Sequence, residues 1–244
     1  MPPAKNKLGQ PIGDALPDWQ GALRPGRTAI VGDRCTLQPL GVENHAAELY
    51  DAFADDTDGA LWTYLSYGPF ASLKEYTAWL GEQAASEDPL FYAIVGKTDG
   101  CALGVASYLR IEPEAGAMEV GHIALSPRLQ KTAMATEAMY LLMAHAFEVL
   151  GYRRYEWKCD ALNAASRRAA LRLGFSFDGI FRQATVYKRR NRDTAWYSIL
   201  DRDWPALRQG FSQWLDPGNF DNDGRQQSTL QDCLAEAAAP SSRP

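Results

Sequence analysis

Apolar side chains recur at helical spacing most clearly in the stretch that ends at residue 150. The spacing is i, i+3, i+4, i+7, i+8 and i+11, and the residues are Met139, Leu142, Met143, Ala146, Phe147 and Leu150. This stripe predicts an amphipathic helix with one face on a core. Gly151 comes next, and glycine at this place commonly ends a helix. Shorter patterns predict further helices over residues 43–54, 72–85, 163–174 and 203–215.

Short apolar runs bounded by turn residues predict the strands. They cover residues 34–40, 90–95, 102–111, 117–125, 154–159, 175–186 and 193–200. Short turns join the second, third and fourth of these strands, so we expect them to be antiparallel neighbours. A helix joins the fourth strand to the fifth, so we expect these two to run parallel. The fold class is α/β (α+β), a mixed and mainly antiparallel sheet with helices on both faces.

The two ends of the chain differ from this central pattern. Residues 1–27 are rich in proline and glycine and lack periodicity, which predicts an N-terminal arm. The apolar residues by which the arm can dock on the core are Ile12, Leu16 and Trp19. Residues 216–244 are polar and rich in small side chains, and we expect much of this tail to be mobile. One domain is therefore expected over residues 28–215.

Composition places the chain among soluble globular proteins. Of its 244 residues, 46% are hydrophobic and 23% are charged. No apolar stretch approaches the ~20 residues that span a bilayer, and the N-terminus lacks a secretion signal, so we expect a cytoplasmic protein without a membrane partner. The four cysteines include no C-x-x-C pair, and the three histidines are scattered. We therefore expect reduced thiols, no disulfide framework and no local metal site.

The charge is unevenly distributed along the chain. The net formal charge is −5, but residues 153–192 contain 11 basic and 3 acidic side chains, a net charge of +8. A basic block inside an acidic protein suggests a local anionic partner, which is either a phosphorylated cofactor or nucleic acid, or else a solvated face. The acidity of the whole protein disfavours nucleic acid.

The candidate chemistry starts where a strand runs through a short loop into the clearest helix, over residues 119–137. The first amides of a helix lack internal partners and lie at the positive end of its dipole. Such amides can bind a pyrophosphate. Taken alone, the pattern is explained better by a plain strand, loop and helix.

Four motifs follow one another in the order of a known family. They are Glu119-Val-Gly-His122, then Gln130-Lys-Thr-Ala-Met-Ala135 with Thr136-Glu137-Ala138, then Asn163-Ala-Ala-Ser166 with Leu173-Gly-Phe175, and finally Gly179-Ile-Phe-Arg-Gln-Ala184. Over about residues 28–204 the chain resembles the GNAT superfamily of acyl-CoA N-acetyltransferases, in particular its RimJ/RimL-like branch. The pyrophosphate motif of that family is Q/R-x-x-G-x-G/A. Its sheet splays between the strands that correspond to residues 117–125 and 154–159.

The resemblance implies an acyl-CoA-dependent N-acetyltransferase that uses acetyl-CoA as cosubstrate and no metal. A protein N-terminus or a small amine would attack the thioester directly, without a covalent enzyme intermediate. The residues expected to bind the pyrophosphate are Gln130, Lys131, Thr132, Ala133, Met134 and Ala135. The backbone of Ile123, Ala124 and Leu125 would polarise the thioester carbonyl. Asn163 would bind the pantetheine arm, unless it only caps a helix.

Two residues are the catalytic candidates. Glu119 would act as the base, directly or through water, and its alternative is a strand carboxylate paired with an arginine. Ser166 would stabilise or protonate the leaving thiolate, and its alternative is a second helix-capping group. The aromatic residues Trp62, Tyr64 and Tyr67 would bind the amine substrate, although core packing explains some of them equally well.

Basic side chains near these motifs are candidates for the coenzyme phosphates. The candidates are Arg128, Lys131, Arg167, Arg168 and Arg172. We interpret the run 188–192 as a solvated hairpin tip. His122 is either a partner beside the active strand or, as we favour, a histidine satisfied on the sheet.

Three positions depart from the family pattern. Ala133 replaces the central glycine of the pyrophosphate motif, although its N–H remains. Ala170 stands where many relatives have a tyrosine that protonates the thiolate, and Thr185 where some have a carboxylate. These departures leave a second hypothesis open, a coenzyme A-binding module with little catalysis. The acceptor, the acyl chain length and the formation of a homodimer also stay open.

Overall fold

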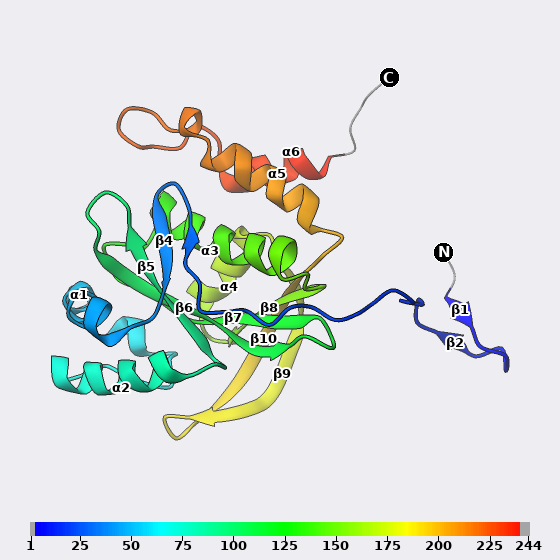
Figure 1. Ribbon diagram of the computed structural model, residues 1–244, viewed down its shortest axis with the longest axis horizontal. Coiled ribbons are helices and arrows are strands. Elements are labelled where there is room, and N and C mark those ends of the chain that lie inside the picture. The colour runs from blue at the N-terminus through cyan, green and yellow to red at the C-terminus, as the bar shows by residue number, and fades with distance from the viewer. Residues whose placement is uncertain (1–2, 240–244) are drawn as a thin grey trace.

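An eight-stranded sheet runs through the molecule in the computed structural model, which describes residues 3–239 (Figure 1). Its strands, in spatial order, are β3 (Ile30–Val31), β4 (Cys35–Pro39), β5 (Leu90–Gly96), β6 (Ala102–Glu112), β7 (Ala117–Leu125), β8 (Arg154–Asp160), β10 (Arg190–Leu200) and β9 (Ser176–Tyr187). Neighbouring strands are antiparallel, except β7 and β8, which are parallel. The expected mixed sheet and its parallel pair are confirmed. The short edge strand β3 was not predicted.

Helices cover both faces of this sheet (Figure 1). One face carries α1 (Val42–Ala54) and α2 (Leu73–Ala85), and the other carries α3 (Ala133–Ala144), α4 (Ala164–Arg172), α5 (Trp204–Leu215) and α6 (Leu230–Ala238). α3 continues into a π-helical turn, His145–Val149, and two short 3-10 turns are Ala60–Trp62 and Pro217–Asn219. The predicted helices are confirmed to within a residue or two, whereas α6 was not predicted. No helix within residues 3–239 is both long and apolar enough to cross a bilayer.

Alternation along the strands divides the apolar side chains between two cores. Tyr92 and Ile94 of β5 belong to the core under α3, whereas Phe91, Ala93 and Val95 belong to the core under α1 and α2. β5 is therefore buried on both faces, as expected for a central strand.

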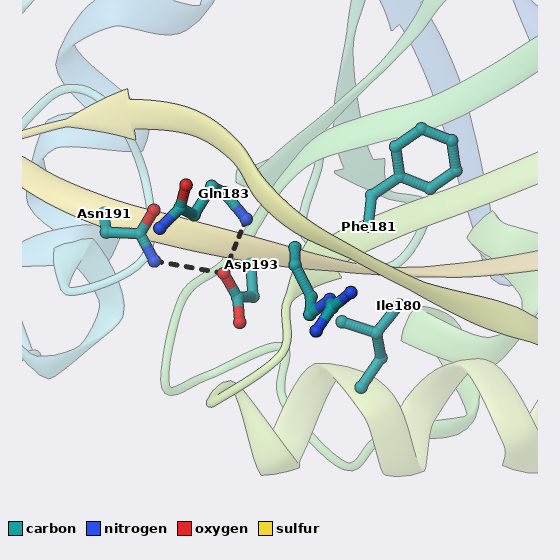
Figure 2. Close-up of a pocket in the computed structure, with 6 residues that line it drawn as sticks. Ile180, Phe181, Gln183, Asn191 and Asp193 are labelled. Atoms are coloured by element: carbon teal, nitrogen blue, oxygen red, sulfur yellow. Dashed lines mark hydrogen bonds between the residues drawn. The ribbon is translucent and has the colours of Figure 1, made fainter.

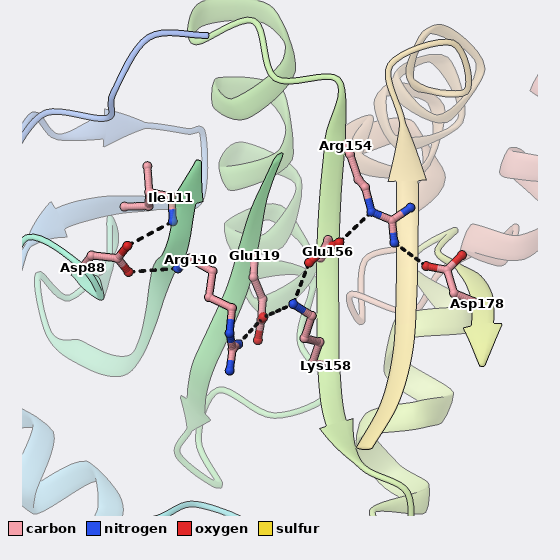
Figure 3. A network of polar contacts seen from close by, with 8 residues as sticks. All are labelled: Asp88, Arg110, Ile111, Glu119, Arg154, Glu156, Lys158 and Asp178. Carbon is pink, nitrogen blue, oxygen red and sulfur yellow. Dashed lines mark hydrogen bonds and ion pairs between the residues drawn. The ribbon is translucent and has the colours of Figure 1, made fainter. Parts of the chain in front are cut away.

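The sheet has a polar face beyond β6, on the side where α1 and α2 pack against β5 and β6. Met118 and Val120 of β7 belong to the α3 core, so Glu119 between them faces the opposite way. The same alternation in β8 places Glu156 and Lys158 on this polar face. The charged side chains there pair with one another across the strands (Figure 3).

β7 and β8 separate halfway along their length. Their pairing ends at Val120 and Trp157, although β7 continues to Leu125 and β8 to Asp160. The β6–β7 ladder shifts register at the same place, and His122 has a φ of 50° in the left-handed region. A bulge of this kind bends a strand, here away from its parallel neighbour. The expected splay is confirmed.

A buried carboxylate ties the start of β4 to α3. Glu137 accepts hydrogen bonds from the amides of Asp33, Arg34 and Cys35 at 3.2, 2.7 and 2.8 Å. The Arg34 guanidinium lies 3.6 Å from the same carboxylate. A Cβ at Gly32 would approach Glu137 Oε2 to 2.7 Å, so glycine is needed there. The Glu137 of the helix-start motif is thus a structural anchor.

The N-terminal arm docks through one of its three candidate residues. The Trp19 indole N–H donates to the Glu114 carbonyl at 2.8 Å, and its ring lies 5.4 Å from the Arg153 guanidinium. Ile12 and Leu16 are exposed. The first residues described form a small hairpin of β1 (Ala4–Lys5) and β2 (Pro11–Ile12). Residues 1–2 of the expected arm lie outside the described residues.

The C-terminal tail contains a packed helix, so the expected mobility is wrong for α6. Thr229 and Asp232 form a reciprocal capping box at its start. Leu230 and Cys233 are buried, and Gly210 of α5 lets the two helices approach closely, since a Cβ there would lie 2.8 Å from the Leu234 Cα. Residues 240–244 of the expected tail lie outside the described residues.

We expect Glu137→Gln to lower the free energy of unfolding by about 3 kcal/mol, because a neutral amide replaces a charged acceptor of three backbone hydrogen bonds. Urea unfolding followed by circular dichroism measures this change. The control is Glu82→Gln on the exposed surface of α2, which should stay within about 0.5 kcal/mol of the unmodified protein. An equally small effect at Glu137 would contradict its anchoring role.

Candidate active site

Two cavities meet beside Trp157, where β7 and β8 separate. The α3 cavity has a volume of about 710 Å³ and lies between the start of α3, α4 and residues 214–226. The splay cavity has a volume of about 370 Å³ and lies between β7, β8, residues 61–66 and the β9–β10 hairpin. Trp157 lines both cavities. Two ligands, one in each cavity, would therefore meet at the gap in the sheet.

The start of α3 presents free backbone donors. Thr132 is the N-cap, and its Oγ1 accepts a hydrogen bond from the Ala135 amide at 3.1 Å. Within residues 3–239, the amides of Lys131, Ala133 and Met134 have no acceptor. Amides at a helix N-terminus favour an anion, so this loop fits a pyrophosphate.

Most of the residues expected to bind the pyrophosphate line the α3 cavity. They are Lys131, Thr132, Ala133 and Ala135, together with Leu125 from the end of β7. Gln130 shapes the loop instead, because its Nε2 donates to the Leu125 carbonyl at 2.9 Å. The side chain of Met134 packs against the α3 core. Ile123 and Asn163 line the splay cavity, whereas the Ala124 side chain is buried in the core under α1 and α2.

Arg172 is the α4 arginine that lines the α3 cavity. Its Nη1 donates to Thr136 Oγ1 at 3.1 Å, and its guanidinium lies 5.3 Å from the centroid of the Trp214 ring. These two contacts hold a positive charge between the first turn of α3 and Trp214. The cavity therefore offers an anionic ligand both backbone donors and a cation.

Two of the other basic candidates have protein partners instead. Arg128 binds Asp51 and Asp55 of α1 through contacts of 2.9 and 2.6 Å, so its charge is neutralised. Arg167 donates to the Tyr197 hydroxyl at 3.0 Å. Neither residue lines the α3 cavity.

Asn163 and Ser166 line the splay cavity at the start of α4. Asn163 Oδ1 accepts from the Ser166 amide at 3.0 Å and so caps the helix, while its Nδ2 remains a donor. Ser166 is not a second capping group, because its Oγ accepts from Trp157 Nε1 at 2.9 Å. Since that contact uses a lone pair, the Ser166 hydroxyl can still donate its hydrogen.

Glu119 lines the splay cavity from the middle of β7. It is paired with Arg110, and the Lys158 ammonium lies 3.1 Å from its Oε2 (Figure 3). Burial raises the pKa of Glu119 above its ordinary value, although both cations oppose the rise. The arginine pairing that was its alternative role is therefore present, and the side chain still faces the cavity rather than the apolar core.

The cation beside Glu119 belongs to a longer chain of ion pairs. Lys158 also contacts Glu156 at 2.7 Å, Arg154 contacts Glu156 at 2.6 Å, and Arg154 contacts Asp178 at 2.6 Å (Figure 3). Alternating charges thus run across β7, β8 and β9. This order fixes Glu119 and Lys158 with little freedom to move.

His122 faces the same cavity from the bulge in β7. It stacks on Tyr67 with ring centroids 5.6 Å apart, and its Nδ1 lies 3.3 Å from the Tyr67 hydroxyl. Burial, with Arg110 and Arg192 nearby, lowers the pKa of His122 to about 4. The imidazole is therefore neutral near pH 7, and it is both a satisfied sheet residue and a wall of the cavity.

The three aromatic substrate candidates are divided between cavity and core. Tyr64 lines the splay cavity, and its hydroxyl donates to the Leu162 carbonyl at 3.2 Å. Trp62 is buried in the core under α1 and α2, where it packs edge-on against Phe53. Tyr67 stands behind His122 and reaches the cavity only through it. Core packing, the alternative reading of these residues, applies to Trp62.

Several cavity residues were not predicted from the sequence. Asp160 accepts a hydrogen bond from the Tyr187 hydroxyl at 2.8 Å, and Lys158 and Arg192 also line the cavity. Lys188 Nζ donates to the Trp62 carbonyl at 2.6 Å, which holds the β9–β10 hairpin over the cavity. The interpretation of 188–192 as a solvated tip holds for the exposed residues 188–191 and is wrong for the half-buried Arg192. The alternation of side chains along β8 could have predicted from the sequence that Lys158 and Asp160 share a face with Glu156.

A further cavity of about 750 Å³ lies along the β9–β10 hairpin (Figure 2). Asp193 Oδ1 accepts from the Gln183 amide at 2.7 Å and from Asn191 Nδ2 at 3.0 Å. Its carboxylate is therefore used to brace the hairpin, and this cavity offers no group arranged for catalysis. Within residues 3–239, no group of three or more His, Cys, Asp or Glu side chains is placed to hold a metal ion.

A family model described as "Acetyltransferase (GNAT) domain" matches residues 34–176, which is more than half of the chain. The chain belongs to this GNAT acetyltransferase family. The members of this family are acetyltransferases. The α3 cavity, with its free amides and Arg172, offers hydrogen-bond donors to an anionic ligand.

Individual GNAT relatives agree with this assignment. A GCN5-related N-acetyltransferase from Brucella melitensis is 44% identical and superposes with a TM-score of 0.88, covering 90% of this chain and 100% of that chain. A probable GNAT-family acetyltransferase from Chromobacterium violaceum is 44% identical with a TM-score of 0.74, covering 80% and 97%. The ribosomal-protein-serine acetyltransferase of Escherichia coli (strain K12) is 34% identical over 100 residues, or 41% of this chain and 55% of that protein. This chain thus matches about half the length of that RimJ/RimL-like relative.

We expect Ala133→Pro to weaken acetyl-CoA binding about tenfold or more, because it removes one charge-assisted N–H donor. Proline is tolerated at the first residue of a helix, and the preceding Thr132 is already extended (φ −94°, ψ 160°), as proline requires. Titration calorimetry measures the affinity, and the melting temperature should change little. Leu73→Pro, at the first residue of α2 and outside both cavities, is the control. Unchanged binding by Ala133→Pro would contradict the phosphate role of the loop.

Proposed function

We propose that this enzyme transfers an acetyl group from acetyl-CoA to a primary amine, a protein N-terminus or a small amine, by direct attack. The observation that carries the proposal is the meeting of the α3 cavity and the splay cavity beside Trp157. Acetyl-CoA in the α3 cavity would bring its thioester to the gap between β7 and β8. An amine in the splay cavity would then approach that thioester from the polar face of the sheet.

The attacking amine must be neutral. An α-amine with a pKa near 8 is roughly 10% neutral at pH 7, whereas a lysine with a pKa near 10.4 is under roughly 0.1% neutral. An N-terminal or other weakly basic amine therefore needs only modest help from a base. This difference favours such amines over lysine side chains in a site whose candidate carboxylate is already paired with two cations.

Glu119 is the proposed base, acting directly or through water. It lines the splay cavity, and its pKa is raised by burial, which brings it closer to that of the amine. Arg110 and Lys158 hold the carboxylate in place and keep it ionised. The proton would thus pass from the amine to a group whose position is fixed before the substrate binds.

The backbone of β7 beyond Val120 is the proposed oxyanion site. Residues 121–125 have no ladder partner in β8, so the edge that faces the gap is free for a ligand. N–H groups of Ile123, Ala124 or Leu125 that point to this edge would polarise the thioester carbonyl and stabilise the tetrahedral oxyanion.

Ser166 is the proposed donor to the leaving thiolate. Its Oγ accepts from Trp157 Nε1, which directs the serine hydrogen elsewhere. Ala170 is fully buried and has no hydroxyl, so it cannot take the role that a tyrosine has at that position in many relatives. Thr185 lines the splay cavity but is not ionisable. Catalysis would therefore depend on Glu119 and Ser166.

The reducing cytoplasm is the proposed location. All four cysteines are free thiols, and Cys35, Cys159 and Cys233 are buried. Free thiols of this kind persist where glutathione and thioredoxin keep proteins reduced.

We expect Glu119→Gln to lower kcat about 100-fold, because a positioned base contributes roughly this much to a proton transfer. The acidic limb of the pH–rate profile of kcat/KM should disappear with it. In the unmodified enzyme, activity falls as the pH falls through the raised pKa of Glu119, since protonation removes the base. Release of coenzyme A thiol in the presence of an amine and peptide panel measures both effects.

Glu156→Gln is the matched control for Glu119. It also removes one carboxylate from Lys158, but Glu156 does not line the splay cavity. This variant should keep most of kcat. Full activity of Glu119→Gln would exclude a base role, and tight acetyl-CoA binding without turnover of any amine by the unmodified protein would favour the coenzyme A-binding module.

We expect Ser166→Ala to lower kcat about tenfold to 100-fold and to leave the KM for acetyl-CoA within about threefold, because the hydroxyl acts on the departing thiolate rather than on binding. Steady-state kinetics measures both constants. Ser166→Thr keeps the hydroxyl and should retain more activity than Ser166→Ala. Equal activity of Ser166→Ala and the unmodified enzyme would remove the serine from the mechanism.

A further inference from the structure

Two buried donors lack partners beside the proposed acceptor site. Arg192 Nε and Trp196 Nε1 are both buried, and within residues 3–239 neither has a hydrogen-bond acceptor. An unsatisfied buried donor is destabilising, so native proteins seldom keep two together. An acceptor group that belongs to a ligand would remove this cost.

Both residues line one cavity on the polar face of the sheet. This outer cavity has a volume of about 410 Å³ and adjoins the splay cavity, since Arg110, Lys158, Thr185 and Arg192 line both. Trp196 lines only the outer cavity and not the splay cavity. A ligand group at Arg192 would thus lie next to the space in which the amine is expected.

Arg192 is the cation of these cavities that has no carboxylate partner. Arg110 is paired with Glu119, and Lys158 contacts both Glu119 and Glu156. Within residues 3–239, Arg192 forms no ion pair. The positive charge that remains uncompensated therefore sits on a guanidinium, which matches the two oxygens of a carboxylate.

The position of Arg192 is fixed by the hairpin that carries it. Arg192 pairs with Thr185 of β9 in the β9–β10 ladder, and Trp196 pairs with Lys158 of β8. The Lys158 ammonium lies 3.8 Å from the centroid of the Trp196 ring. Lys188 at the hairpin tip holds the whole element against the loop of Trp62. A preorganised donor loses little entropy when it binds a ligand.

The groups around Arg192 do not give it a partner, although the carboxylates of Glu112 and Glu156 also line the outer cavity. His122, which faces the same space, is uncharged near pH 7 because its pKa is lowered to about 4 by burial and by Arg110 and Arg192. The Asp160 carboxylate is already bonded to the Tyr187 hydroxyl and to the Leu162 amide. No described group other than a ligand is therefore in place to satisfy Arg192.

We propose that Arg192 binds a carboxylate of the amine acceptor, with the Trp196 N–H as a second donor, so that the enzyme selects amines that carry a carboxylate close by. The carboxylate is either the α-carboxylate of a free amino acid or the side chain of an acidic residue at a peptide N-terminus. This inference rests on the proposed function, because it places the amine in the splay cavity. It adds a class of acceptor to that function.

Acceptors matched except for the carboxylate test the proposal, with kcat/KM expressed per neutral amine because a nearby carboxylate also raises the pKa of the amine. The first pair is L-alanine and alaninamide, and the second is a C-terminally amidated peptide that begins with Asp and the same peptide beginning with Asn. We expect the unmodified enzyme to prefer the carboxylate member of one pair at least tenfold in kcat/KM, which identifies the source. Arg192→Gln should abolish this preference, and Arg192→Lys should restore part of it.

Arg190→Gln is the matched control, because Arg190 is exposed on the same strand and lines none of these cavities. It should keep the preference. Melting temperatures of the variants close to that of the unmodified enzyme exclude a loss of fold. A preference that survives in Arg192→Gln, or its absence from both pairs in the unmodified enzyme, would overturn the proposal.

A second measurement separates this inference from the proposed function. Calorimetry with the N-acetylated forms of the same compounds needs no turnover. If no amine in the panel is acetylated, the proposed function fails, but binding of the N-acetylated acid over its amide, lost in Arg192→Gln, would still support the carboxylate site. Equal binding of the acid and the amide in that case would overturn the site as well.

Discussion

The parallel pairing of β7 and β8 stops at Val120 and Trp157, and the rest of the site depends on that interruption. A complete ladder would consume the backbone groups of both strands and close the sheet. The left-handed His122 and the register shift against β6 turn β7 aside instead, and a cavity opens on each face. The bulge thus exchanges a few ladder hydrogen bonds for two cavities on opposite sides of one sheet.

The polar face of the sheet is organised as strictly as the apolar one. Charged groups taken out of water are costly unless they are paired. Here Glu119 of β7 pairs with Lys158 of β8, and the pairs continue along β8 through Glu156 to Arg154. This order lets the site hold a buried carboxylate with a raised pKa without leaving it unpaired. Among the described residues, Arg192 belongs to no ion pair of this chain and therefore keeps an uncompensated charge.

Local periodicity was enough to predict most of the helices and strands, and the helix between β7 and β8 predicted that this pair is parallel. The free amides before α3 could also be predicted, since any residue but proline supplies a backbone N–H at a helix start. The roles of side chains that depend on partners far away in the sequence could not be predicted from the sequence. Arg128 lies in the loop before α3 but binds carboxylates at α1. Trp62 and Tyr64 are two residues apart, but the first is in the core and the second lines the splay cavity. Lys188 donates a hydrogen bond to a carbonyl 126 positions away in the sequence. The helix α6 was missed because its capping box lies in a stretch of polar and small residues.

The α3 cavity is built from two ends of the chain. Its amides come from the start of α3, whereas Trp214, Phe220, Gly224 and Gln226 form another wall and follow the matched family segment, which ends at residue 176. During synthesis, the first wall leaves the ribosome about ninety residues before the last one. The α3 cavity is therefore completed late, and a nascent chain that already has the start of α3 and the strands of the splay cavity still lacks one wall of the α3 cavity.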